Sequence, residues 1–116
     1  MPESLATYGN HSVAVDEEGF LLDATQWSRD MVPDIASSVG IEMSDRHWEV
    51  VDFIRDYFVT NHAVPELRTF LKYLREKYDK QTATRKYVYS LFPYGYGQQA
   101  CKIAGMRKPR KLMLDV

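Results

Sequence analysis

The sequence predicts a mainly α-helical fold with a small N-terminal β-hairpin, a helical bundle that contains a helix-turn-helix-like pair, and a flexible C-terminal arm. Its 116 residues fit one domain, and 45% of them are hydrophobic, which is enough apolar surface for a folded core. Apolar residues recur every three to four positions through the middle of the chain, as in helices that bury one face. After residue 95 the chain becomes rich in glycine and then basic, which is typical of a mobile end. We therefore expect an N-terminal tail at residues 1–10, a helical domain at 11–94 and an arm at 95–116.

The N-terminal third carries the signals for turns and breaks. Residues 11–23 contain two short β-prone runs on either side of a turn in which Gly19 takes a positive φ, and this pattern predicts the hairpin. A helix is expected from about Thr25, a capping residue, to Gly40. Because Pro33 has no amide hydrogen to donate, we expect that helix to be kinked or split.

Two stronger helices are expected at residues 44–60 and 65–79. Ser44 is a good N-cap for the first, whose apolar residues share one face: Trp48, Val51, Ile54, Tyr57 and Phe58. Pro65 suits the first position of the second helix, which shows a basic stripe on another face: Arg68, Lys72 and Arg75. Thr84 is expected to cap a further short helix that ends at Phe92 and Pro93. The first two helices could form a DNA-binding helix-turn-helix, although their linking turn lacks the glycine common in that motif.

The formal net charge of −1 conceals a split along the chain. Residues 1–58 contain twelve acidic and three basic side chains, whereas residues 59–116 contain four acidic and twelve basic ones. Two interpretations stay open. In one the halves pack against each other and are partly neutralised, and in the other an exposed basic surface recruits an acidic partner.

The chain has a single cysteine, Cys101. One cysteine closes no intramolecular disulfide, and it fits a reducing compartment such as the cytoplasm. No run of about 18 apolar residues indicates a membrane span. The three histidines lack metal-ligand spacing, so we expect no metal and no cofactor.

Cys101 lies next to Lys102 and close to Arg107 and Lys108. Positive charge stabilises a thiolate, which is the nucleophilic form of cysteine. The alternative is a small hydrophobic residue packed in the core beside Ile103, and the residues themselves leave both interpretations open.

Two longer motifs carry a family resemblance. The first is Gly40-Ile-Glu-Met-Ser44 followed by His47-Trp-Glu-Val50, and the second is Gly95-x-Gly-x-Gln-Ala-Cys101-Lys-Ile-Ala-Gly-Met106 followed by Lys108-Pro109. Over roughly residues 13–111 the chain is similar to the DsrC/TusE family of sulfur-trafficking proteins. That resemblance implies a small helical fold with an N-terminal hairpin and a C-terminal arm.

The resemblance also implies a sulfur chemistry that this chain lacks in part. DsrC-type members handle sulfur with two cysteines on the arm, and TusE-type members keep only the terminal one. Cys101 matches the upstream cysteine, whereas the position of the terminal cysteine is Leu112, four residues before the end of the chain. Since leucine has no thiol, the usual carrier residue is missing.

Three functions remain open. The first, which we favour, is a partner-binding or regulatory protein with no independent catalysis, which engages a sulfite-reductase-like complex or a sulfurtransferase of the sulfur relay. The second is a relay component in which Cys101 itself accepts sulfur or forms a mixed disulfide, and the third is a DNA-binding regulator. The candidate contact residues are basic or lie on the arm: Arg68, Lys72, Lys102, Gly105, Arg107, Lys108 and Pro109.

Overall fold

The structure is a computed structural model that describes residues 4–109. It begins with an antiparallel hairpin of β1 (Ser4–Tyr8) and β2 (His11–Val15). A hairpin is therefore present, but the expected tail supplies its first strand. The turn at Gly19 also forms, with φ +88°, yet it leads only to a single bridge between Val15 and Leu21. The second β-prone run forms no strand, and its Phe20 and Leu21 are buried in the core.

The expected helix at 25–40 is split into three short pieces. Two 3₁₀ turns, η1 (Ala24–Gln26) and η2 (Arg29–Met31), precede α1 (Val32–Ser38). Pro33 lies in the first turn of α1, where a missing amide hydrogen costs no helical hydrogen bond. Asp23, rather than Thr25, caps the first 3₁₀ turn. The end of α1 at Gly40, with φ +75°, is as predicted.

The long central helix, α2 (Asp45–Asn61), confirms the strongest sequence signal. Ser44 accepts a hydrogen bond from the amide of His47, and the His47 ring accepts one from the amide of Ser44, so both ends of a capping box are present. The most deeply buried residues of the helix are Val50, Val51 and Ile54.

Two further helices, α3 (Leu67–Lys77) and α4 (Arg85–Leu91), complete the outer part of the bundle. Pro65 does not begin α3, because Glu66 is its N-cap and Pro65 lies one residue earlier. Thr84 caps α4 as predicted, through a hydrogen bond from the amide of Tyr87.

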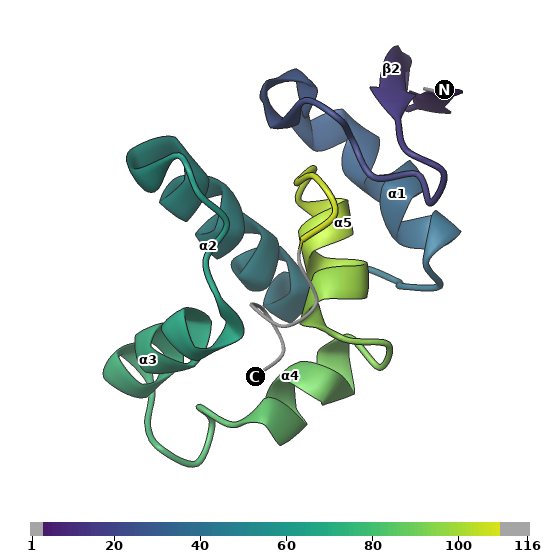
Figure 1. The fold of residues 1–116 in the computed structure, drawn as a ribbon. Coiled ribbons are helices and arrows are strands. Elements are labelled where there is room, and N and C mark those ends of the chain that lie inside the picture. Colours follow the sequence, from purple (N-terminus) through teal and green to yellow (C-terminus); the bar gives the residue numbers. More distant parts are fainter. Residues whose placement is uncertain (1–3, 110–116) are drawn as a thin grey trace.

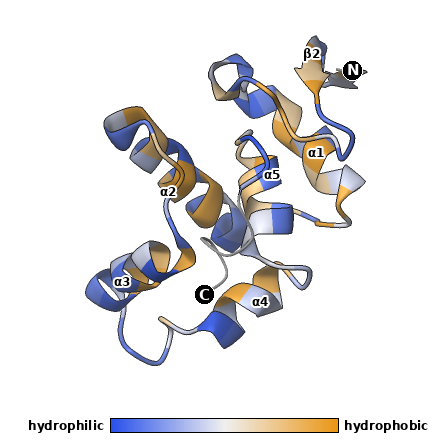
Figure 2. Ribbon diagram, viewed as in Figure 1, coloured by the Kyte–Doolittle hydropathy of each residue, from blue (hydrophilic) through white to orange (hydrophobic). Residues whose placement is uncertain are grey.

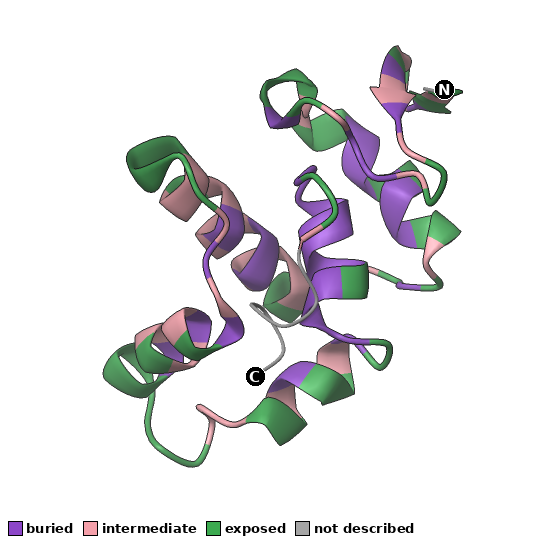
Figure 3. Cartoon of the chain, viewed as in Figure 1, coloured by how far each residue is buried: buried purple, intermediate pink, exposed green. Residues whose placement is uncertain are grey.

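The C-terminal segment, which we define as residues 95–106, differs most from the prediction. It forms a π-helical turn, η3 (Tyr96–Ala100), and then α5 (Cys101–Ile103), which lies between α1 and α2 (Figure 1). Apolar residues line α1 and the middle of α2 on either side of it (Figure 2). The segment is almost continuously buried (Figure 3). Of the residues expected to form the arm, 95–106 are therefore packed against the helices. Residues 110–116 lie outside the described part.

Within residues 4–109, no helix is both long enough and apolar enough to cross a membrane.

Candidate functional site

Cys101 lies at the centre of the core. Its residue exposure is 0%, and the same is true of Ala100, Ile103, Ala104 and Met106 around it in the chain. Of the two interpretations that the sequence left open, the geometry favours the packed core residue over an accessible thiolate.

A tight helix end fixes the residues after Cys101. The amide of Gly105 donates to the carbonyl of Lys102, and the amide of Met106 donates to the carbonyl of Cys101, both at 3.0 Å. Gly105 has φ +78°, which completes a Schellman motif. A Cβ atom there would lie 2.2 Å from Cδ1 of Trp27. Gly105 is thus required by packing as well as by backbone conformation.

Two side chains from other elements hold the end of α5. Trp27 Nε1 donates to the carbonyl of Ile103 at 2.9 Å, and Arg55 Nη1 donates to the carbonyl of Ala104 at 3.0 Å. The Arg55 guanidinium lies 4.6 Å from the centre of the Trp27 ring, and burial lowers its pKa. The role of Arg55 could not be predicted from the sequence, because this residue lies off the apolar stripe of α2 and nothing local connects it with residue 104.

Gln99 joins the C-terminal segment to α1. It is 2% exposed, its Oε1 accepts a hydrogen bond from the amide of Tyr94, and its Nε2 donates to the carbonyl of Val39, both at 2.8 Å. Both ends of the amide are therefore used inside the protein, as is usual for a buried polar side chain.

The predicted contact residues do not gather in one patch. Arg68 and Lys72 are exposed on α3, where Arg68 pairs with Glu66 at 2.7 Å. Lys102 is almost fully buried, and Gly105 is part of the core.

The remaining predicted contact residues follow the core segment. Arg107 and Lys108 are exposed, Pro109 is half-buried, and Lys108 pairs with Glu18. Leu112 lies outside the described residues.

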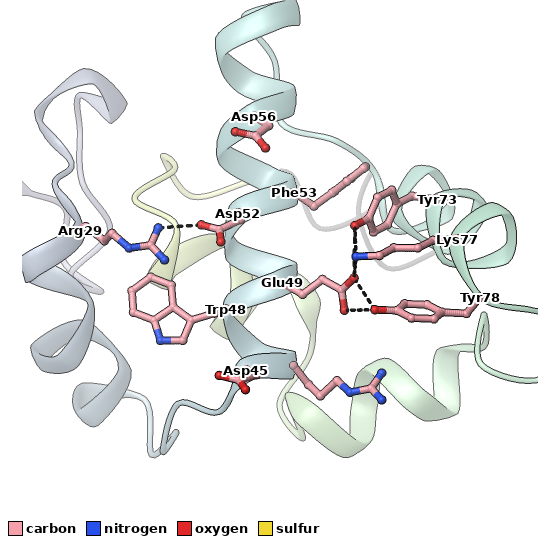
Figure 4. Close-up of a pocket in the computed structure, with 11 residues that line it drawn as sticks. Arg29, Asp45, Trp48, Glu49, Asp52, Phe53, Asp56, Tyr73, Lys77 and Tyr78 are labelled. Carbon is pink, nitrogen blue, oxygen red and sulfur yellow. Dashed lines mark hydrogen bonds and ion pairs between the residues drawn. The ribbon is translucent and has the colours of Figure 1, made fainter.

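A groove of about 670 Å³ runs along α2 (Figure 4). On one side Arg29 pairs with Asp52 at 2.9 Å, and its guanidinium lies 4.1 Å from the centre of the Trp48 ring. The floor includes Phe53, and the acidic residues of α2 follow one another along the groove: Asp45, Glu49, Asp52 and Asp56. The sequence analysis did not identify this surface.

On its other side the groove is closed by a cluster around Glu49. The Glu49 carboxylate accepts hydrogen bonds from Lys77 Nζ at 2.7 Å, from the Tyr78 hydroxyl at 2.8 Å and from the Tyr73 hydroxyl at 3.2 Å. Burial opposes ionisation of Glu49, but these donors outweigh it and lower its pKa. The same hydrogen bond raises the pKa of Lys77. The cluster joins α3 to α2, and the raised pKa of Lys77 keeps its amine protonated and non-nucleophilic, so we interpret the groove as a structural and binding surface.

Comparison with known proteins places this geometry in a family. A family model described as "DsrC like protein" matches residues 7–113. The sulfurtransferase TusE of Pectobacterium atrosepticum is 38% identical over 104 residues, which cover 90% of this chain and 95% of that protein. The sulfurtransferase TusE of Escherichia coli is 39% identical over 99 residues, which cover 85% of this chain and 91% of that protein.

Solved structures agree in fold. The NMR structure of Allochromatium vinosum DsrC matches with a TM-score of 0.81 and 33% identity, covering 94% of this chain and 97% of that one. The oxidized gamma-subunit of the dissimilatory sulfite reductase (DsrC) from Archaeoglobus fulgidus matches with a TM-score of 0.74 and 30% identity, with the same coverage. None of these four names refers to a nucleic acid, so the comparisons add no support for the DNA-binding alternative.

Proposed function

This chain belongs to the family of DsrC-like proteins, and on that premise we propose that it is a partner-binding component of sulfur transfer that does not carry sulfur on a thiol of its own. The observation that carries the proposal is the burial of Cys101, the only cysteine of the chain, at 0% exposure. Sulfur moves between proteins when a thiolate attacks the outer sulfur of a donor, so both sulfur atoms must meet. A thiol enclosed in the core does not meet that requirement.

The names of the relatives support the class of partner. Curated relatives are called sulfurtransferases, and one of the matched structures is the gamma-subunit of a dissimilatory sulfite reductase. A protein with this fold and no accessible thiol keeps the shape that such partners recognise. We therefore propose a sulfurtransferase or a sulfite-reductase-type enzyme as the partner, in the reducing cytoplasm.

The exposed face of α3 supports an electrostatic contribution to docking. Lys72 and Arg75 are exposed and make no ion pair with any residue between 4 and 109. Together with Arg68 they recur along one helix at spacings of four and three residues, so they present positive charge in one direction. An acidic surface on the partner complements this stripe and speeds the encounter.

The relay alternative makes a different demand on the structure. For Cys101 to accept sulfur, α5 must leave the core and give up the hydrogen bonds from Trp27 to Ile103 and from Arg55 to Ala104. Persulfide formation would then be a conformational event as well as a chemical one. Sulfur bound to Cys101 would therefore contradict the proposal.

The test is a mass measurement on the native protein. We expect incubation with a cysteine desulfurase, cysteine and pyridoxal phosphate to leave the intact mass unchanged, while a protein with an exposed cysteine in the same tube gains about 32 Da, the mass of one sulfur atom. A gain of one sulfur that disappears in Cys101→Ala would contradict the proposal.

Docking is tested separately, by titration calorimetry with a purified sulfurtransferase and with a purified sulfite reductase. We expect binding to one of them, weaker at high salt and about tenfold weaker in the double variant Lys72→Glu, Arg75→Glu. The matched control is Lys86→Glu, a charge reversal at an exposed lysine on α4. Absence of binding to both proteins at low salt would rule out the proposed docking role.

A further inference from the structure

A second pocket, of about 460 Å³, lies away from the groove on α2. It is formed where the turn around Glu18 and Phe20 meets the end of α1 at Val39 and the loop at Tyr94. Lys102, next to the buried cysteine, lines it from α5. The pocket thus joins the N-terminal turn to the C-terminal segment.

Lys102 is unusual for a lysine because most of its side chain is buried while its ammonium group faces the pocket. The residue is 9% exposed, and its Nζ makes no hydrogen bond and no ion pair with any residue in the described range 4–109. The Phe20 ring lies beside the ammonium, with its centre 5.7 Å from Nζ. Gly19 makes room for the group, because a Cβ at that position would lie 3.1 Å from Lys102 Nζ.

Neither nearby carboxylate makes an ion pair with Lys102 in the described residues, and both have other partners. Asp16 Oδ1 already accepts hydrogen bonds from the amides of Glu18 and Phe20, at 2.8 and 3.0 Å, and the Glu18 carboxylate pairs with Lys108. Burial lowers the pKa of Lys102, and the charges of Asp16 and Glu18 only oppose that effect from a distance. A lysine ammonium has three donors, and within residues 4–109 no protein acceptor binds any of them, so a ligand that brings an acceptor into the pocket gains a charge-assisted hydrogen bond.

The rim of the pocket carries an exposed aromatic side chain. Tyr94 is 78% exposed although its backbone amide is fixed by Gln99 at 2.8 Å. Large aromatic residues at the edge of a pocket are common anchors in protein interfaces, because they bury much surface at little entropic cost. Tyr94 therefore indicates that a protein, rather than a small molecule alone, covers this pocket.

We propose that the Lys102 pocket receives the carboxylate of an aspartate or glutamate side chain from the protein partner, with Tyr94 packing against the same partner segment. This inference rests on the proposed function for the identity of the occupant, and it names the chemistry that the occupant brings. A carboxylate supplies the acceptors that the ammonium lacks. Lys102 is the one cation among the residues found to line the pocket, and Glu18 lies at its rim, so a doubly charged phosphate is less well matched.

The direct test uses two small probes on the full chain, followed by ¹H–¹⁵N NMR. N-acetyl-glutamate N-methylamide should produce saturable shifts at the amides of Gly19, Phe20 and Lys102, and the glutamine analogue, equal in shape but neutral, should not. Equal responses to both probes, or no saturation up to a probe concentration of about 100 mM, would overturn the inference. Saturation by inorganic phosphate without saturation by the glutamate probe would also overturn it.

Variants then tie the response to one side chain. Lys102→Met keeps the length of the side chain and removes its charge, so we expect the glutamate response to disappear while the thermal midpoint stays the same or rises. Lys86→Met is the matched control, since it removes an exposed charge on α4 and should leave the response unchanged. The comparison of the two probes needs no variant, so it decides the matter even where Lys102→Met fails to fold.

The same variant separates this inference from the proposed function. In the calorimetric titration with the partner, Lys102→Met should weaken binding about tenfold. Unchanged affinity for a partner that does bind would overturn the inference and leave the docking role standing. A sulfur atom gained on Cys101 would overturn the proposed function. It would not affect the conclusion that the two probes give about the Lys102 pocket.

Discussion

The C-terminal segment and α3 look alike in chemistry but differ in exposure. Both carry lysine or arginine residues that the sequence marked for partner contact, and yet Lys102 is buried whereas Lys72 is exposed. The segment is buried along almost its whole length between α1 and α2, whereas α3 buries only one face, which carries Leu67, Phe70 and Leu74, and turns its basic residues to solvent. The difference teaches that residue type alone does not locate a docking surface. In this protein the segment with the cysteine forms the core, and α3 provides the exposed charge.

The largest effect is expected from a substitution that disturbs the packing at the end of α5. Gly105→Ala places a methyl group against Trp27 at a positive φ, so we expect a loss of about 3 kcal/mol or more in the free energy of unfolding. Gly40→Ala is the matched control, because Gly40 ends α1 with a similar φ of +75° and has nothing within 4 Å of its added Cβ. That control should cost about 1 kcal/mol. Urea unfolding measures both, and equal losses would show that the C-terminal segment is as open as the end of α1.

A second prediction concerns the link between the segment and α1. Gln99→Met removes the hydrogen bonds to the Tyr94 amide and the Val39 carbonyl while keeping a similar volume, so we expect a loss of about 2 kcal/mol. Gln98→Met is the control, because it makes the same substitution at the preceding residue, whose side chain is exposed. An equal loss of unfolding free energy for Gln98→Met and Gln99→Met would contradict the placement of the π-helical turn, in which only Gln99 is buried.

The attachment of α3 should depend on pH. Glu49 has a lowered pKa in the folded protein, so its contribution to stability is present above its ordinary pKa of 4.5 and is lost as the pH falls through the lowered value. We expect Glu49→Gln to cost up to about 1 kcal/mol at pH 7, because the cluster is partly exposed. Thermal unfolding between pH 7 and pH 3 should show the stability difference between the unmodified protein and Glu49→Gln becoming smaller. A difference that grows as the pH falls would contradict the lowered pKa of Glu49.

The smallest effect on stability is expected on the exposed face of α3. Lys72→Ala and Arg75→Ala should each change the free energy of unfolding by less than about 0.5 kcal/mol, because neither side chain is buried. A larger loss in urea unfolding would mean that these cations support the fold, and that their effect on partner binding could not be assigned to docking.

Much of the helical framework could be predicted from the sequence, because its signals are local. Ser44 caps α2, Thr84 caps α4, and Gly40 ends α1, each through the few residues beside it. The position of the hairpin could not be predicted from the sequence. Residues 11–15 could pair with the run before them or with the run after them, and local signals do not choose between the two. Residues 11–15 pair with residues 4–8, whereas the run after Gly19 is drawn into the core.

The candidate site was harder to predict for a physical reason. Glycines at 95, 97 and 105 suggest mobility when only the chain is considered, but the fold uses the one at 105 to bring backbone and Trp27 into contact. Likewise, the charges beside Cys101 suggest an exposed thiolate, while Ile103 and Met106 indicate burial. Only the arrangement of α1 and α2 around the segment decides between them.

The central claim is that the thiol of Cys101 is enclosed in the folded protein. Its most direct test is the rate of alkylation by iodoacetamide, followed by intact mass in native buffer. The thiol should react only through opening of the fold, so Gly105→Ala, at a loss of about 3 kcal/mol, should accelerate labelling about 100-fold while Gly40→Ala does so far less. Labelling of the unmodified protein at the rate seen in urea, with no response to Gly105→Ala, would contradict the claim.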